Sequence, residues 1–595
     1  MQQDNLSGRR IGLFALSLLA VCVGIVTGVG AVAFRALIGL IHNAFYFGQL
    51  SPAYDANALE PASPWGPGII LVPVIGGLVV TFLVSKFAPE ARGHGVPEVM
   101  DAIFYRDGRI RPVVAAVKSL ASALSIGTGA AVGREGPIIQ IGASLGSTLG
   151  QWVRMEAWQR VTLVAAGAGA GIAATFNTPL GGVMFAVELM MPEVSVRTFL
   201  PVALATGTAT FIGRYFLGVR PAFDVPANLF RVEAAPTSFN ALLLCVLLGA
   251  LCGVAATAFI RAMHVSERLF ERMRNPYLRH GLGMSLVGLM MYAFFLGSGH
   301  YRIDGVGYAT IQEILIGGLA AAPFLALLFA SKLTATSISL GSGSSGGIFS
   351  PSLFMGATIG GAFGATAQSL LPLPNITVPG FAMIGMAAMV GGGTGAAMTA
   401  IVMIFEMTRD YDIVMPMILA VAVSIGVRRM LSEENIYTIK LARRKHFIPK
   451  AMHANMFLIR RAGEVMEKDF QLLPRTTGFD EFLRMPERDG TLRHIVVTDG
   501  ERIAGTLRVN TSLRHGLEGA YTGVSLGSVA SETFTIAHEN DIMFEVIHRF
   551  WRKKASMIVV VRGSGMPRAS NVAGVITKEH IADSVADSVR PYVAA

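Results

Sequence analysis

The chain has 595 residues, of which 52% are hydrophobic and 15% charged, with a formal net charge of +10. Its mean hydropathy is +0.54. Soluble globular proteins carry about 25% charged residues, so this composition excludes an ordinary soluble protein. The positive charge forms no basic stripe interleaved with aromatic residues, and we therefore expect no nucleic-acid partner.

Long uncharged runs identify the membrane part of the chain. Residues 11–34, 67–85 and 161–187 contain no charged residue, and 281–301 contains only a histidine, taken as neutral. Residues 333–405 contain no Asp, Glu, Lys, Arg or His at all. A spanning helix needs about 20 apolar residues, so the chain is predicted to cross a membrane many times.

Basic residues flank this apolar region on both sides. Arg9 and Arg10 precede it, and Arg443, Arg444 and Lys445 follow it. Because cytoplasmic segments beside membrane helices are enriched in Lys and Arg, we expect a multi-pass protein of the cell membrane with both termini in the cytoplasm.

The composition changes near residue 440, from apolar and glycine-rich to that of a soluble α/β module. We predict an all-α polytopic membrane domain over 1–445 and a linker over 446–461. Two similar α/β units follow, at 462–519 and 524–588, each with the order helix, strand, turn, strand, helix. The clearest strands are predicted at 493–498 and 557–561.

The membrane part contains an internal repeat with a constant offset in residue number (347 − 133 = 214). Glycine and proline also interrupt apolar segments at matched places in the two halves. Broken backbone at membrane depth survives only where protein or a water-filled cavity satisfies it, and inverted repeats with broken helices are typical of transporters. The repeated residues are Gly129, Gly133, Pro137, Gly142, Ala143 and Gly146 in the first half, and Gly343, Gly347, Pro351, Gly356, Ala357 and Gly360 in the second.

Three glycine-rich segments open predicted helices: 93–97 (Gly-His-Gly-Val-Pro), 133–137 (Gly-Arg-Glu-Gly-Pro) and 347–351 (Gly-Ile-Phe-Ser-Pro). A helix N-terminus offers an anion free N–H groups and about half a positive charge. Glycine lets the backbone approach the ion, and proline in the first turn costs no hydrogen bond. The segments therefore favour an anion site built from backbone amides.

In this order and spacing, the three segments resemble the anion-binding loops of the CLC family of chloride channels and chloride/proton exchangers. The 133–137 segment is identical to the family pattern, and Tyr437 stands where the family points a tyrosine at the central anion; its alternative is an interfacial aromatic. The resemblance covers residues 10–445, and the two units behind it resemble CBS domains. It implies a homodimer in a lipid membrane, with one chloride pathway in each subunit.

The resemblance also implies roles for single residues. Glu135 resembles the gating glutamate, whose carboxylate competes with anions for the outer site and swings away when protonated; its alternative is a helix N-terminal charge that only stabilises the fold. Lys118 and Arg134 match basic positions that draw anions towards the pathway, or they form structural ion pairs. The implied anion-binding residues are His94, Gly95, Arg134, Glu135, Gly136, Gly347, Ile348, Phe349 and Tyr437.

Two departures from the family pattern bear on mechanism. The first loop usually centres on serine, and here it has His94, whose reference pKa near 6.5 would allow transport to depend on cytoplasmic pH. Exchangers of the family commonly carry two adjacent glutamates where this chain has Glu188 and Leu189. Because leucine cannot relay a proton, the sequence favours passive, channel-like conduction, with a proton-coupled antiporter as the alternative.

Other classes fit less well. A CBS-containing divalent-cation transporter would line its midplane with carboxylates, which residues 333–405 lack. No nucleophile–base pair or cluster of metal ligands stands in the apolar region, so we expect no enzyme, no metal and no cofactor. Fluoride specialists of the family fit less well than chloride transporters, because Tyr437 and the 133–137 segment are kept.

The sequence also allows predictions about nucleotide binding by the tail and about the subunit interface. CBS pairs often bind adenine nucleotides through a glycine, a hydroxyl residue and an acid, and Thr577 would supply the hydroxyl. His580 stands where the ribose-binding acid is expected, so a purely structural tail is an equal alternative. The apolar segments 200–213 and 413–427 are expected at the dimer interface by position.

Overall fold

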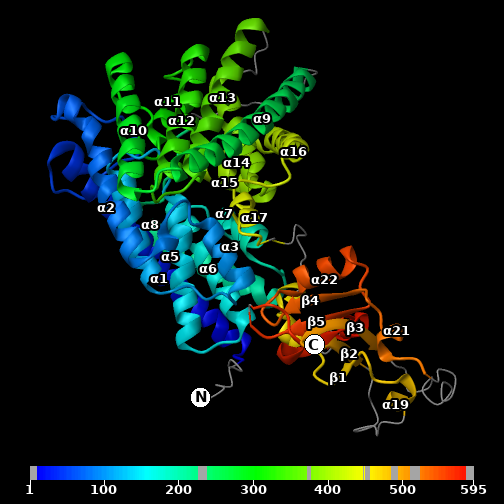
Figure 1. Cartoon of the computed structure of the whole chain (residues 1–595). Helices are drawn as coiled ribbons and strands as arrows, with labels where there is room; N and C mark the ends of the chain where they lie inside the picture. The colour runs from blue at the N-terminus through cyan, green and yellow to red at the C-terminus, as the bar shows by residue number, and fades with distance from the viewer. Residues whose placement is uncertain are drawn as a thin grey trace. The chain divides into compact units, whose positions relative to one another are not determined.

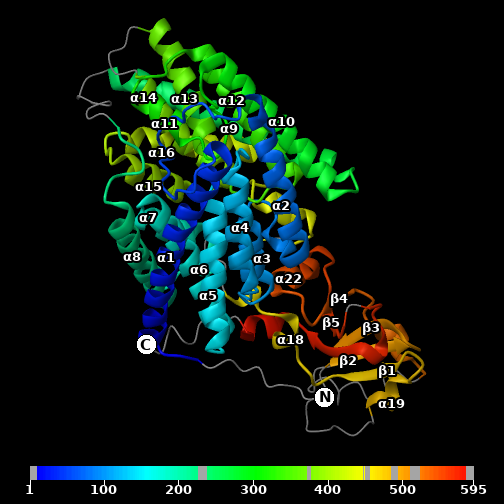
Figure 2. The same cartoon turned by 90° about the vertical axis from the view of Figure 1, so that its left-hand side faces the viewer.

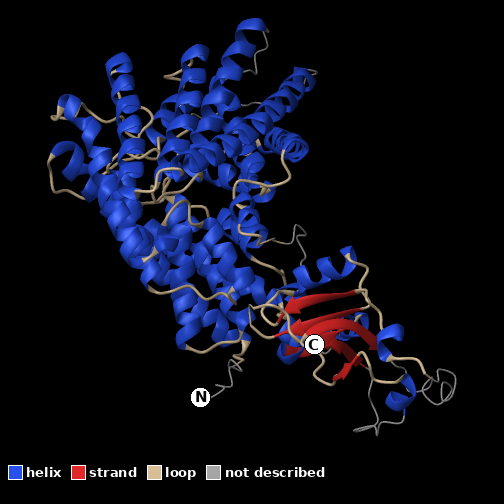
Figure 3. Cartoon of the chain, viewed as in Figure 1, coloured by secondary structure: helices blue, strands red, loops and turns tan. Residues whose placement is uncertain are grey.

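The computed structural model describes residues 10–225, 237–371, 377–446, 448, 456–483, 494–508, 523–563 and 565–584. The chain forms two compact units, Met1–Ile448 and Pro449–Ala595. Among the described residues, the first unit is helical and the strands occur in the second (Figure 3). In the predicted linker at 446–461, residue 447 and residues 449–455 lie outside the described part.

The membrane unit is built from long apolar helices. Seven helices in the described part of the chain are long and apolar enough to cross a membrane, the first being α1 (Leu13–Phe47). Large apolar side chains on α1 point outwards, with Phe14 85% and Leu18 58% exposed. Such exposure suits helices surrounded by lipid. The other six spans are Gly66–Phe87, Val196–Leu217, Asn240–Glu271, Pro276–Ser298, Ala322–Ser342 and Val414–Leu431.

The helices form two halves, coloured blue to teal and green to yellow in Figures 1 and 2. The first half contains η1 (Gly66–Ile70), α2 (Leu71–Phe87), η2 (Pro89–Ala91), α3 (Val96–Tyr105), α4 (Val113–Gly127), α5 (Glu135–Trp152), α6 (Ala157–Phe176), α7 (Pro179–Phe185), the π-helical turn η3 (Ala186–Met190) and α8 (Val196–Leu217). The second half contains α9 (Thr237–Glu271), α10 (Pro276–Ser298), α11 (Tyr308–Leu315), α12 (Ala322–Ser342), α13 (Phe349–Leu370), α14 (Val378–Thr394), α15 (Ala397–Thr408), α16 (Val414–Leu431) and α17 (Thr438–Arg443).

The helix boundaries follow the repeat. The starts of α5 and α13 differ by the predicted offset (349 − 135 = 214). The starts of α7 and α15 differ by slightly more (397 − 179 = 218), and so do those of α8 and α16 (414 − 196 = 218). The second half is therefore slightly longer between its copy of α5 and its copy of α7.

Reciprocal hydrogen bonds join the two halves. The backbone N–H of Ser345 donates to Ser125 Oγ at 3.1 Å, and the N–H of Ala131 donates to Ser339 Oγ at 3.2 Å. The two donors are related by the repeat offset (345 − 131 = 214), and so are the two acceptors (339 − 125 = 214). Contacts that exchange in this way are expected of two halves related by a two-fold axis, as in transporters built from inverted repeats.

In the part of the tail unit that the structure describes, the strands form two three-stranded sheets of the same topology. In each, the first strand pairs in parallel with the second and the second pairs antiparallel with the third. The predicted strands 557–561 and 493–498 correspond to β5 and β2, although residue 493 lies outside the described part. The leading strand of each sheet, β1 or β4, was not predicted from the sequence. The elements are η4 (Met456–Ile459), α18 (Ala462–Val465), β1 (Gln471–Pro474), α19 (Phe479–Leu483), β2 (His494–Asp499), β3 (Arg502–Arg508), α21 (Leu526–Val529), β4 (Phe534–His538), α22 (Met543–Arg552), β5 (Met557–Val561), η5 (Ala569–Asn571) and β6 (Val572–Ile576).

The two α/β units exchange their leading segments. Ala462 and Val465 of α18 pack in the apolar core of the second sheet with Met543 and Ile558. In return, Leu526 of α21 packs in the core of the first sheet. The predicted units begin at 462 and 524, so each short helix was assigned to the sheet that follows it in sequence. In the structure, each helix packs on the sheet of the other unit. Residues 509–519 and 585–588 of the predicted units lie outside the described part.

A buried histidine in the tail allows us to predict how the stability of the tail depends on pH. His494 of β2 is 5% exposed, its Nδ1 has no hydrogen-bond partner among the described residues, and its ring lies 5.1 Å from that of His580. Burial, with positive charge nearby, lowers the pKa of His494 to about 4. Since the unfolded histidine has a pKa near 6.5, the unfolded tail binds the proton more readily, and stability falls as the pH drops from about 6.5 towards 4.

We expect the tail to lose about 1–2 kcal/mol of stability over that range, because solvent screens part of the effect. Hydrogen exchange of β2 and β5 in the full-length protein, corrected for intrinsic rates, measures the loss between pH 7 and pH 5. The His494→Leu variant removes the titrating group and should show a smaller pH dependence. Equal protection of the wild-type strands at both pH values would contradict the prediction.

Candidate anion site

Backbone hydrogen bonds hold the three glycine-rich loops together. The N–H of Gly133 donates to the carbonyl of Gly347 at 2.7 Å, and the N–H of Gly347 donates back to the carbonyl of Gly133 at 2.6 Å. The first loop joins them, because the N–H of Gly346 donates to the carbonyl of Gly93 at 3.3 Å and the N–H of Gly93 to the carbonyl of Ser344 at 3.2 Å. The structure thus brings the three predicted loops to one place.

This close approach depends on glycine. A Cβ at Gly136 would lie 2.2 Å from the carbonyl oxygen of His94 and 2.9 Å from the Cα of Gly347. Gly95 has a φ of +82°, which L side chains rarely adopt, and a Cβ there would lie 2.7 Å from Gln140 Oε1. The predicted site glycines are therefore required by backbone packing, and the helix N-termini converge because no side chain separates them.

Glu135 lies at the centre of this convergence. It is the first residue of α5 and is fully buried. Its carboxylate accepts the backbone N–H of Ser350 at 3.2 Å and the hydroxyl of Tyr308. The carboxylate therefore occupies the N-terminus of α13, where Ile348 and Phe349 begin the helix. A negative group is favoured there by the free N–H groups and the helix dipole.

A second group of predicted residues lies around His94. Its side chain is 2% exposed, and neither ring nitrogen has a hydrogen-bond partner among the described residues. The ring of Tyr437 lies 5.8 Å away, and Tyr437 is itself buried immediately before α17. Asn435 fixes this turn, because its Oδ1 accepts the N–H groups of Tyr437 at 2.9 Å and Thr438 at 2.8 Å.

Lys118 is fully buried and holds the first loop by its backbone. Its Nζ donates to the carbonyls of Ala91 at 3.0 Å and Gly93 at 2.7 Å. Lys332 is its counterpart in the repeat (332 − 118 = 214), and it donates in the same way to the carbonyls of Ile303 at 2.8 Å and Gly305 at 2.9 Å. Both lysines therefore bind backbone carbonyls of a loop rather than an acidic side chain.

Arg134 lies beside a cavity of about 680 Å³ in the membrane unit. Its guanidinium carbon is 5.1 Å from the centre of the Tyr308 ring. Arg35 and Arg220 also line the cavity, together with the acids Asp55 and Asp224. Basic and acidic side chains thus line this cavity together.

At the predicted inner proton position, the glutamate side chain is hydrogen-bonded to the protein backbone. Glu188 accepts the backbone N–H groups of Met398 at 2.9 Å and Thr399 at 2.7 Å, at the start of α15. Its repeat partner, Glu406, accepts the N–H groups of two residues at the start of α7, at 3.2 and 2.7 Å. Leu189 follows Glu188 in the π-helical turn and is half-buried. The two glutamates thus link α7 and α15 reciprocally.

Thr577, the predicted nucleotide residue, already has partners in the tail. Its hydroxyl donates to Glu579 Oε2 at 3.1 Å, and its backbone N–H donates to His580 Nδ1 at 3.3 Å. Glu579 is also paired with Arg508 at 2.6 Å, and this guanidinium lowers the pKa of the carboxyl.

Tyr308 was not among the site residues predicted from the sequence. This residue begins α11, is 2% exposed, and bonds both Glu135 and Ser350. The repeat contains the signal that would have found it, because the same offset relates Tyr308 to His94 (308 − 94 = 214). Its chemistry differs from that of histidine, so the correspondence does not show in a comparison of identical residues.

Comparisons with known proteins identify the family of this chain. Residues 76–429 match the family model described as voltage gated chloride channel. The H(+)/Cl(-) exchange transporter ClcA of Salmonella paratyphi B is 31% identical over 438 residues, which are 72% of this chain and 88% of that protein. The crystal structure of a slow cyanobacterial Cl-/H+ antiporter is similar with a TM-score of 0.63 and 26% identity, over 72% of this chain and 97% of the other.

The similarity in fold extends into the tail. The crystal structure of a eukaryotic CLC transporter is similar with a TM-score of 0.61 and 20% identity, over 96% of this chain and 98% of that one. The C-terminal region is thus a mixed α/β region that resembles a CBS pair. The chain belongs to the voltage gated chloride channel (CLC) family, so it is a multi-pass membrane protein that transports anions and is not an enzyme.

The glycine contacts lead to a prediction about the site. In Gly136→Ala the new Cβ meets two backbones, which cannot rotate aside, so the loops must separate. Because displacements of about 1 Å at a site can cost about 100-fold in rate, we expect chloride efflux from proteoliposomes to fall at least about tenfold. Gly393→Ala is the matched control, since a Cβ at this buried position meets no atom within 4 Å beyond the adjacent backbone of its own helix. Wild-type efflux from Gly136→Ala, with Gly393→Ala unchanged, would show that the loops tolerate separation.

Proposed function

We propose that this protein conducts chloride passively through a pathway in each subunit, with Glu135 as the gate. The observation that carries the proposal is that the buried Glu135 carboxylate accepts a hydrogen bond from the backbone N–H of Ser350, at the start of α13. An anion mimic tethered to the protein occupies the position that a permeant anion would take. When the carboxylate leaves, the same donors become available to chloride.

The donors around the position are neutral, which suits passage. The backbone amides of Ile348 and Phe349, at the start of α13, would bind the central anion. The Tyr437 hydroxyl and one ring N–H of His94 would complete its shell, and the His94 nitrogens have no other partner among the described residues. Because no fixed full charge touches the ion, binding stays weak enough for the anion to leave.

Passive conduction is supported by the inner proton position. Exchangers of the family commonly carry a titratable group there, although some manage without it, and Leu189 has none. Glu188 binds the N-terminus of α15 through both carboxylate oxygens. Backbone donors thus hold both carboxylate oxygens in place, which does not suit a proton carrier.

Chloride/proton exchange is the second candidate, and the comparisons favour it. ClcA and the cyanobacterial protein are described as exchangers of chloride and protons. Their similarity covers most of the membrane unit of this chain. The two functions share the gate and differ only in whether chloride movement is coupled to protons.

Topology and assembly follow from the same proposal. The basic flanks at Arg10 and Arg443 favour termini in the cytoplasm. We propose a homodimer through α8 and α16, which carry the predicted interface segments 200–213 and 413–427. Phe211 on α8 and Met415 on α16 are large, exposed apolar side chains, as expected of surfaces that pair within a membrane. The tail would be a CBS pair, with an adenine nucleotide as its candidate ligand near Thr577.

Reconstituted full-length protein under opposed chloride and proton gradients decides between the candidates. Passive conduction reverses at the chloride equilibrium potential whatever the pH gradient, and we expect this result. A reversal potential that moves with the proton gradient would establish exchange instead.

The Glu135→Gln variant tests the gate in the same experiment. The neutral amide mimics a protonated carboxyl, so its chloride flux should be several-fold higher at neutral pH and lose its dependence on external pH. Glu188→Gln is the matched control and should keep the wild-type pH dependence, because Glu188 binds α15 and lies outside the gate. Flux that remains low and pH-dependent in Glu135→Gln would exclude Glu135 as the gate.

His94 leads to a separate prediction. It forms no hydrogen bond or ion pair among the described residues, so we expect it to act as a neutral donor. His94→Ser keeps a hydroxyl donor but shortens the side chain, and should change the apparent chloride affinity about three- to tenfold. Stopped-flow flux between pH 5 and pH 8 should retain its pH profile. A pH profile that disappears in the variant would identify His94 as the pH sensor.

A further inference from the structure

Tyr308 makes the bond that fixes the far side of the Glu135 carboxylate. Its hydroxyl donates to Glu135 Oε1, while the backbone N–H of Ser350 donates to Oε2 at 3.2 Å. A phenol has one hydrogen, so the Ser350 hydroxyl, 2.9 Å from the Tyr308 oxygen, is the donor in their contact. Each carboxylate oxygen is therefore held by a separate element, α11 or α13.

Packing fixes the direction of this hydroxyl. The Tyr308 ring meets Phe223 edge-on at 5.4 Å, lies 6.3 Å from Phe176, and carries the Arg134 guanidinium at 5.1 Å. A ring held on several sides cannot swing with the carboxylate. The hydroxyl therefore stays in place when Glu135 moves.

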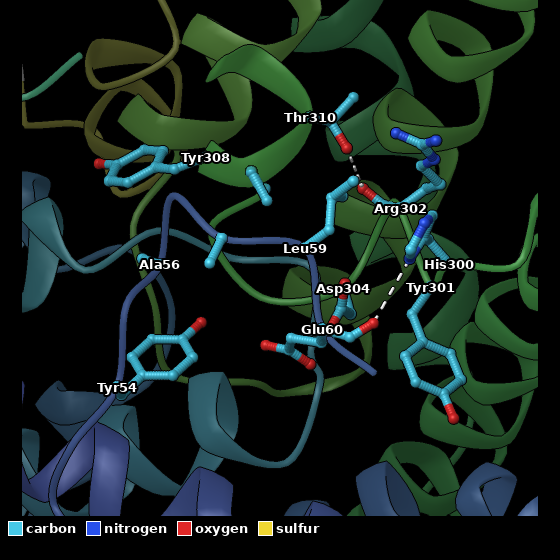
Figure 4. A pocket seen from close by; sticks show the side chains of 13 residues that line it. Tyr54, Ala56, Leu59, Glu60, His300, Tyr301, Arg302, Asp304, Tyr308 and Thr310 are labelled. Carbon is cyan, nitrogen blue, oxygen red and sulfur yellow. Dashed lines mark hydrogen bonds between the residues drawn. The ribbon is translucent and has the colours of Figure 1, made fainter. Parts of the chain in front are cut away.

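The neighbouring pocket does not compete for this hydroxyl. Tyr308 lies at one end of a pocket that also contains Glu60 and Asp304, and Figure 4 shows its hydroxyl pointing away from both acids. Asp304 instead meets the hydroxyl of Tyr46 at 3.4 Å, and Glu60 meets the ring of His42 at 3.1 Å. The Tyr308 hydroxyl is left to Glu135 and Ser350.

The repeat gives Tyr308 a matched position in the other half. It corresponds to His94, and the preceding residues, Gly307 and Gly93, both have positive φ, +77° and +78°. Lys332 and Lys118 hold the two loops through their carbonyls in the same way. The same loop thus presents a side chain to the pathway in each half, and only the second presents it to a carboxylate.

We propose that Tyr308 is a positioning residue of the gate: its hydroxyl holds the Glu135 carboxylate in the docked position and so sets how readily the pathway opens. This rests on the proposed function of Glu135. A hydrogen-bond donor favours the charged, docked form of a carboxylate. Removal of the donor makes both undocking and protonation easier, so the pathway opens more often and at higher external pH.

Other charged groups around the pair would act on the same equilibrium. Among the described residues, Arg134 and Arg35 interact electrostatically with Tyr308, and Tyr437 interacts with Glu135. Lys332 lies behind Gly307, with its Nζ 3.2 Å from where a Cβ of that glycine would stand. All of these remain in a Tyr308→Phe variant, which removes one hydroxyl and keeps the packed ring.

The test is chloride flux from proteoliposomes containing full-length protein, measured against external pH. A hydrogen bond to a charged group corresponds to roughly a tenfold change in equilibrium. We therefore expect Tyr308→Phe to raise flux at neutral pH about tenfold and to move the half-maximal pH upwards. Tyr46→Phe is the matched control, since it also removes a buried hydroxyl, and it should leave both values unchanged.

A double variant separates this proposal from the proposed function. In a Glu135→Gln background, Tyr308→Phe should change flux less than twofold, because the carboxylate that Tyr308 holds is gone. An equal increase in both backgrounds, or wild-type flux and pH profile in Tyr308→Phe alone, would overturn the role of Tyr308. Failure of Glu135→Gln to raise flux would overturn the gate itself, whatever Tyr308→Phe does. Gel filtration and thermal unfolding of each variant distinguish loss of the hydroxyl from loss of the fold.

Discussion

The anion site depends on the paired backbone hydrogen bonds between Gly133 and Gly347. These two bonds join the starts of α5 and α13, which are far apart in the sequence and would otherwise repel through their positive ends. A negative charge between the two helix N-termini offsets this repulsion. In this chain that charge is the Glu135 carboxylate, and in a conducting state it would be the anion.

The rest of the membrane unit supports this pair. Lys118 and Lys332 fix the neighbouring loops through backbone carbonyls, and Ser125 and Ser339 cross-link the halves. Because these contacts follow the repeat, each half restrains the other. The halves differ in the side chains at matched positions: Glu135 has Phe349 as its counterpart, and His94 has Tyr308. A symmetric scaffold thus holds an asymmetric set of side chains.

His94 and Tyr308 are both buried, but their hydrogen bonding differs. The His94 ring has no partner among the described residues, and an unpaired buried donor is costly unless a ligand satisfies it. The Tyr308 hydroxyl is in the opposite situation, because it is already bonded to Glu135. The two positions therefore differ: the His94 ring nitrogens have no hydrogen-bond partner among the described residues, whereas the Tyr308 hydroxyl is bonded to Glu135.

The sequence by itself determined the membrane class, the repeat, the three loops and the candidate gating carboxylate. These follow from local chemistry: uncharged runs must lie in lipid, and glycine and proline at fixed spacing mark helix starts. Only the tertiary structure decided what Lys118 binds, that Tyr308 reaches Glu135, and that α18 and α21 exchange sheets. These depend on contacts between residues far apart in the chain, and a residue's type does not state its partner. The leading strands β1 and β4 were missed for a related reason, since such short strands acquire their conformation from pairing with β2 and β5.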